Sequence, residues 1–188
     1  MDEHVERLSS KLAPESVRLT LIRAGCFLAV YELIKSEIID GVRGFYCNGI
    51  VDGQITYDER SYEHDVARLN PKSRYQASCE WLVGMDAISQ QQVDLLGDIY
   101  RHRKVIAHEL PRFLIDPDFD VRIDLLVGAT ECVRSLGVFW GTISVQTDPF
   151  WQDEDIDYSR IKSGSFILME YLTELAELEP PVVIDDQR

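Results

Sequence analysis

The sequence has no long uninterrupted apolar run. The longest apolar stretch, residues 24–34, contains Glu32, and it is shorter than the roughly 20 residues that a membrane-spanning helix needs. The first residues are acidic and lack the basic and apolar segments that make up a secretory signal peptide. We therefore expect a cytoplasmic protein with no membrane role.

Paired cysteines are also missing. The four cysteines, Cys26, Cys47, Cys79 and Cys132, are far apart and form no Cys-x-x-Cys motif. Three of them stand in apolar, helix-like surroundings, where a reduced cysteine behaves as a small hydrophobic residue. The spacing therefore favours free thiols over a disulfide framework or a zinc site.

Basic residues are few, with 19 Lys and Arg against 33 Asp and Glu and a formal net charge of −14. Such an excess of negative charge argues against broad, non-specific coating of nucleic acid, but it does not exclude a small, locally basic cleft. Glycine-rich phosphate loops, nucleophile elbows and the spaced oxygens of an EF-hand are absent too. The sequence therefore predicts no cofactor and no metal.

What the sequence does contain is helical periodicity over most of its length. A chain of 188 residues suits one domain, and its hydrophobic and charged fractions are those of a soluble globular protein. We predict a single all-α domain over residues 1–188, with its core in about 14–178 and a disordered tail at 179–188. The predicted helices cover residues 14–40, 61–69, 71–87, 89–110, 121–139 and 158–178.

Two of these helices organise the predicted bundle. The helix over 14–40 has an apolar stripe whose flanks are apolar as well, so it should be covered on more than one side. Gly41 and Gly44 are expected to end it. The helix over 89–110 is expected to be capped by Ser89 or Asp86, to end at Pro111, and to lie at the centre of the bundle.

The stretch 44–63 has a different character. It is rich in residues that favour strands, and it holds two turn dipeptides, Asn48-Gly49 and Asp52-Gly53. We interpret it as a hairpin-like insertion between helices, placed at one end of the bundle.

The segment 101–108, Arg-His-Arg-Lys-Val-Ile-Ala-His, carries the strongest functional signal. It contains two of the four histidines and three of the 19 Lys and Arg residues. Arginine side chains offer fixed forks of donors and histidine titrates near neutral pH, so the cluster could hold a phosphate. The alternative is a solvated basic turn on a surface helix.

A helical wheel divides this segment into two faces. One wide arc should face the core, and it contains Leu95, Leu96, Ile99, Tyr100, Ile106, Ala107 and Leu110. Arg103 falls near the middle of this arc, where a guanidinium would need an anionic partner. Arg101, Lys104 and His108 fall together on the opposite face.

The segment resembles the defining motif of the HEPN superfamily, an all-α group whose members carry Arg, four to six other residues, and then His. Arg103 to His108 satisfies the shorter spacing and Arg101 to His108 the longer one. The apolar residues around the motif and the two long helices on either side of it also resemble the HEPN layout. Lys104 follows Arg103 and His102 follows Arg101, so either arginine could be the motif arginine.

The resemblance implies a metal-independent endoribonuclease in which the RNA 2′-hydroxyl attacks its own phosphate, in a toxin–antitoxin or phage-defence setting. His108 would then transfer protons, and Arg103 or Arg101, helped by Lys104, would stabilise the phosphate oxygens. His102 is a candidate for contact with the substrate. A homodimer would bring two histidines to one cleft, and a protein antitoxin or other regulatory partner is expected. The alternative is a non-catalytic HEPN-like module that binds a nucleotide or a protein.

Overall fold

The computed structural model describes residues 3–148 and 156–178, and over these the chain is mostly helical. The predicted tail at 179–188 and the acidic stretch 149–155 lie outside the described residues. The all-α prediction is confirmed, because the described part contains only one sheet, of two strands. In order, the elements are α1 (Glu3–Lys11), α2 (Pro14–Phe45), β1 (Cys47–Val51), β2 (Gln54–Tyr57), α3 (Glu59–Asp65), η1 (Ala67–Leu69), α4 (Arg74–Gly84), α5 (Gln90–Ile115), α6 (Ile123–Thr147), η3 (Tyr158–Arg160) and α7 (Gly164–Glu177).

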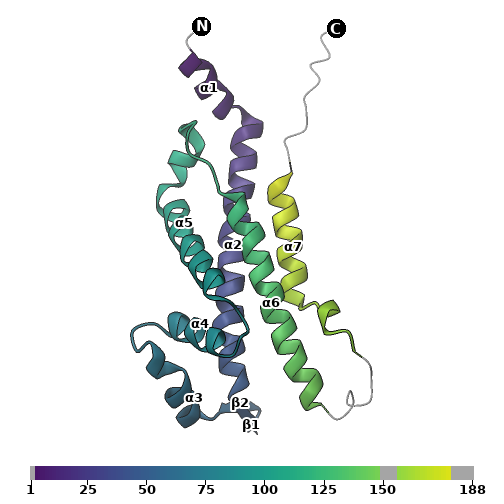
Figure 1. Cartoon of the computed structure of the whole chain (residues 1–188). Helices are drawn as coiled ribbons and strands as arrows, with labels where there is room; N and C mark the ends of the chain where they lie inside the picture. Colours follow the sequence, from purple (N-terminus) through teal and green to yellow (C-terminus); the bar gives the residue numbers. More distant parts are fainter. Residues whose placement is uncertain (1–2, 149–155, 179–188) are drawn as a thin grey trace.

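Helix α2 is the centre of the bundle, and it packs against α4, α5, α6 and α7 (Figure 1). The prediction that the helix after Ser89 would be central is wrong. Helix α2 is the longer of the two, with 32 residues against 26 for α5. It also buries a wider apolar face, which includes Phe27, Val30, Ile34 and Ile38, all with 0% exposure. The apolar flanks seen in the sequence are the reason that α2 can meet four neighbours.

Gly41 and Gly44 do not end α2, which continues to Phe45. A Cβ atom on Gly41 would lie 2.8 Å from Nε1 of Trp140 in α6. Trp140 is stacked on Trp81 of α4, with ring centroids 6.2 Å apart and an interplanar angle of 11°. Gly41 therefore allows α6 to approach α2 closely at this end of the bundle, and it has a packing role instead of a capping one.

The predicted hairpin is confirmed, but it is shorter than the stretch 44–63. Strands β1 and β2 pair antiparallel with Val51 opposite Gln54, so the loop between them has two residues. Asp52 and Gly53 both have positive φ, of 52° and 77°, as the turns of two-residue hairpins require. The hairpin lies at the far end of α2 from the chain termini (Figure 1).

Helix α5 begins where the sequence predicts but ends later. Ser89 and Gln92 form a reciprocal capping box at its N-terminus. Pro111 does not end the helix, which runs on to Ile115 with non-helical dihedral angles at Glu109 (φ −122°, ψ 24°). A proline ring crowds the carbonyl one turn earlier and removes a hydrogen bond, so the helix bends at this turn and then continues.

Two glycines of α2 provide a test of this packing. Gly25→Ala should raise the free energy of unfolding by about 0.5–1 kcal/mol, because alanine favours helix and nothing lies within 4 Å of the added Cβ atom. Gly41→Ala should lower it by about 1–3 kcal/mol, because the methyl group overlaps the indole of Trp140. Urea denaturation of both variants measures the difference. Equal stabilisation by both alanines would contradict the close approach at Gly41.

Candidate functional site on helix α5

Helix α5 is oriented by four buried residues, Leu96, Ile99, Ile106 and Phe113. They turn Arg101, Lys104 and His108 outward, and all three are exposed, as the wheel predicts. We call these three residues the α5 strip. The predicted core arc was too wide, because Tyr100 is 45% exposed and Ala107 is exposed as well.

Arg103 lies at the edge of the contact between α5 and α2. Its guanidinium donates to Glu32 Oε1 at 3.1 Å and lies 5.2 Å from the centroid of the Tyr31 ring. The predicted anionic partner is therefore present. Of the two arrangements that the wheel position allows, a buried guanidinium or one that reaches past its neighbours to water, the structure has the second, because the Arg103 side chain is 33% exposed and that of Glu32 is 51% exposed. A long side chain at a helix edge can keep its charged end near water while its stem is covered.

The residues of the α5 strip have few partners. Arg101 forms an ion pair with Asp98, one turn earlier in the same helix. The Lys104 ammonium lies 5.7 Å from the centroid of the Tyr100 ring. His108 forms no hydrogen bond or ion pair with any residue that the structure describes. The strip therefore presents an imidazole and an ammonium group to solvent.

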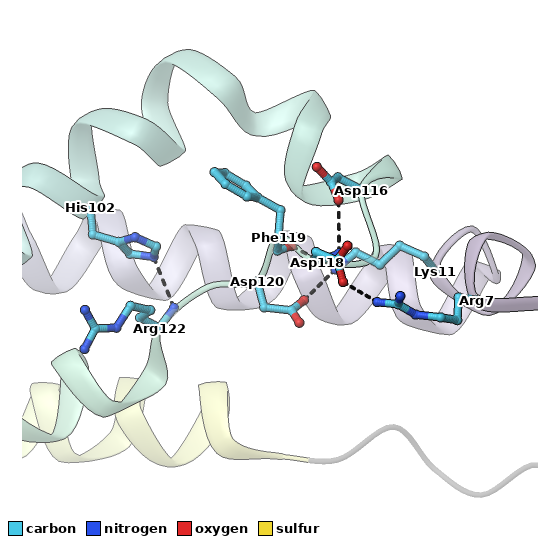
Figure 2. A network of polar contacts seen from close by, with 8 residues as sticks. All are labelled: Arg7, Lys11, His102, Asp116, Asp118, Phe119, Asp120 and Arg122. Atoms are coloured by element: carbon cyan, nitrogen blue, oxygen red, sulfur yellow. Dashed lines mark hydrogen bonds and ion pairs between the residues drawn. The ribbon is translucent and has the colours of Figure 1, made fainter. Parts of the chain in front are cut away.

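His102, which was expected to contact a substrate, does not lie in this strip. Its ring is half-buried and packs edge-on against Phe27, with centroids 4.9 Å apart, and against Phe113, at 5.8 Å. Its Nε2 accepts a hydrogen bond from the backbone N–H of Arg122 at 3.1 Å (Figure 2). His102 is thus a structural residue that joins the start of α6 to α5.

Accepting this hydrogen bond requires an unprotonated Nε2. Burial lowers the pKa of His102 below its usual range, and the positive charge of Arg122 lowers it further. Asp124, on the first turn of α6, acts in the opposite direction. The neutral ring is therefore the form that the folded protein favours.

The loop between α5 and α6 also holds α1, a helix that the sequence reading did not predict. Arg7 of α1 forms an ion pair with Asp118, and Lys11 bonds to Asp120 and to the backbone carbonyl of Phe119, the latter at 3.0 Å (Figure 2). The sequence does contain a pattern that favours this helix, because acidic residues in its first turn and Lys11 in its last turn suit the helix dipole.

The described residues contain no group of three or more His, Cys, Asp or Glu that could hold a metal ion. Burial raises the pKa of the Cys79 thiol and of the Cys132 thiol to about 12, so neither is a ready nucleophile. The prediction of free thiols is borne out for all four cysteines.

Comparisons with known protein families, with curated proteins and with solved structures find no match to this chain. Among the described residues, no helix is both long enough and apolar enough to cross a bilayer. A function for the strip therefore has to be argued from its own chemistry and from the motif in the sequence.

The buried histidine predicts a pH dependence of stability. With a folded-state pKa below the ordinary value of about 6.5, His102 binds fewer protons in the folded state than in the unfolded state. Its contribution to stability is therefore complete above about pH 6.5 and is lost as the pH falls below that value. Urea denaturation should show a decrease in the free energy of unfolding between pH 7.5 and 5.5, and His102→Gln should reduce this decrease.

The matched control for this measurement is His108→Gln, which removes the exposed histidine of the same helix. Because His108 contacts no described partner, the control should follow the wild-type curve. The aspartates whose pKa is lowered, such as Asp116 and Asp124, lose their contribution at more acidic pH than this range. A His102→Gln variant with the full wild-type pH dependence would contradict the assignment.

Proposed function

We propose that the protein is a metal-independent endoribonuclease and that the α5 strip is its catalytic surface. The proposal rests on the resemblance of residues 101–108 to the HEPN motif. The observation that supports it is that Arg101, Lys104 and His108 share one exposed face of a helix in a protein of net charge −14. A fold needs no such concentration of cations on a surface helix, whereas recognition of a phosphate does.

In this reaction the RNA 2′-oxygen attacks the adjacent phosphorus and the bond from phosphorus to the 5′-oxygen breaks. The products are a 2′,3′-cyclic phosphate and a 5′-hydroxyl. One proton leaves the 2′-hydroxyl and one is delivered to the 5′-oxygen, and His108 is suited to either transfer. Lys104 and Arg103 or Arg101 would stabilise the negative charge that develops on the phosphate oxygens.

One imidazole cannot readily act as base and acid in the same step. A two-fold homodimer that joins two α5 strips would supply a second copy of His108. Sedimentation at micromolar concentration should therefore give a dimer. A protein partner such as an antitoxin would be expected to cover the same surface and to block access of RNA.

The decisive test is RNA cleavage by the wild type in EDTA, beside His108→Ala. The wild type should cleave without a divalent metal, and the variant should lose at least about a hundredfold in rate, the usual contribution of one general acid or base. Its melting temperature should stay that of the wild type, because His108 has no partner to lose. Cleavage that stops in EDTA, or that survives in His108→Ala, would overturn the proposal.

Arg103→Ala is the companion variant. Its ion pair with Glu32 is partly exposed, so its loss should cost only about 1 kcal/mol of stability and not the larger cost of breaking a buried pair. A marked loss of cleavage with little loss of stability would identify Arg103 as the motif arginine. The same result in Arg101→Ala, with Arg103→Ala active, would identify Arg101 instead.

A non-catalytic binding module is the second candidate, and one observation favours it. The Arg103 guanidinium is already paired with Glu32, whose carboxylate would repel an RNA phosphate at this position. If the protein is such a module, the wild type should not bind RNA, and Glu32→Gln, which removes the charge but keeps the shape, should not bind RNA either. For the nuclease, the same change should strengthen RNA binding, because it frees the guanidinium.

The salt dependence of binding to single-stranded RNA separates the two candidates. A surface that contacts three phosphates should show a slope of about −2 in a plot of log affinity against log salt concentration. A module that binds only a protein should show almost no RNA binding at any salt concentration. Fluorescence anisotropy with a labelled oligonucleotide measures both outcomes.

A further inference from the structure

A second polar site lies away from the α5 strip, in a cavity of about 350 Å³ between α1, α2 and the loop that follows α5. Three cationic side chains line it, namely Arg7 and Lys11 of α1 and Arg23 of α2. One carboxylate, that of Asp120, lines it as well. This excess of positive charge stands in contrast to the net charge of −14 on the whole chain.

The α2 side of the cavity continues the stripe that forms the core. From Phe27 to Val42 the core-facing positions of α2 are mostly apolar and buried. Toward the N-terminus the same stripe passes through Arg23, Thr20 and Ser16, at helical spacings of three and four residues. These three polar residues line the cavity, so the stripe changes from apolar to polar where the cavity begins.

Hydroxyl groups without partners are the second observation. Ser10, Ser16 and Thr20 line the cavity, and none of their side chains forms a hydrogen bond with the described residues. Thr20 is only 9% exposed. Its hydroxyl oxygen is still accessible to solvent, so the three hydroxyls can donate to a ligand in the cavity.

The cations can accept a further anion. Arg23 uses its Nε to bind the carbonyl of Ala176 at 2.9 Å, and its two terminal nitrogens form no hydrogen bond with the described residues. The side chains that pair with Arg7 and Lys11 are highly exposed, at 78% for Asp118 and 73% for Asp120. Ion pairs of this kind are weak, so an anion inside the cavity can compete for both cations.

We propose that this cavity binds a phosphate group, either free or as the monoester of a small molecule. A phosphate dianion offers several strong acceptor oxygens, which match guanidinium forks, an ammonium group and hydroxyl donors together. The cavity falls within the usual size range of small-molecule sites. The three cations and the Asp120 carboxylate in the lining together carry a net charge of about +2, which suits a phosphate dianion.

The test is binding of inorganic phosphate, 5′-AMP and adenosine, measured by calorimetry and by the shift in melting temperature. The wild type should bind phosphate and AMP, and adenosine should not bind. Arg23→Gln and Thr20→Val should each weaken binding by about tenfold, as expected for the loss of one hydrogen bond to a charged group. Thr20→Val should melt close to the wild-type temperature, because it removes one solvent-accessible hydroxyl and keeps the shape of the side chain.

The matched control is Arg18→Gln, on the same helix. Arg18 is exposed and paired with Glu15 and is not among the residues that line the cavity. This variant should bind phosphate like the wild type.

If neither phosphate nor AMP binds, if adenosine binds as well as AMP, or if all three variants respond equally, the proposal is overturned. Binding to AMP but not to free phosphate would still support it and would identify the ligand as a monoester.

Because these measurements require no RNA and no cleavage, they fail or succeed independently of the nuclease proposal. A wild type that binds phosphate but cleaves no RNA would leave the cavity site intact. A wild type that cleaves RNA but binds neither phosphate nor AMP in the cavity would overturn the cavity site alone.

Discussion

Burial of the apolar face of α2 is the constraint on which the rest of the structure depends. Four helices pack against this one helix, and each is oriented by the apolar side chains that it turns toward α2 or α6. For α5 those side chains are Leu96, Ile99, Ile106 and Phe113. Their position decides that the other side of α5, with its cations and His108, meets solvent.

Phe27 connects this core to the polar end of the bundle. It is fully buried, and its ring supports His102, which in turn accepts the N–H of Arg122. The loop from α5 to α6 is therefore held at both ends. Near its start, Arg112 forms an ion pair with Asp116. Near its end, the backbone N–H of Arg122 donates to His102. With its ends fixed, the loop can present Asp118, Phe119 and Asp120 to α1.

The two proposed sites differ in construction. The α5 strip is an open helix surface whose chemistry would need a second copy of the chain to be complete. The cavity is built within one chain, from α1, α2 and the loop, and Thr20 in its wall is only 9% exposed. An open cationic surface suits a large polyanion, whereas a cavity of this size suits a small one.

The sequence by itself determined the local features. The periodicity of the long helices, the Asp52-Gly53 turn and the outward face of Arg101, Lys104 and His108 depend on residues within a few positions of one another, and these were predicted correctly. Ser89 was one of two candidate caps for α5, and the structure decides for it over Asp86. Only the tertiary structure decided which residues of other elements each helix contacts. The partner of Arg103 is Glu32, 71 residues away.

The same holds for His102, Gly41 and α1. Their roles come from Arg122, Trp140 and the loop at 116–120, which no spacing in the chain identifies. His102 belongs to a basic motif in the sequence, but in the fold its half-buried ring packs against Phe27 and Phe113, and a helical wheel does not show these contacts. Local periodicity sets the direction in which a side chain points from its helix. The packing of helices that are distant in sequence sets what lies in that direction, and therefore which polar residues become structural and which stay free to bind.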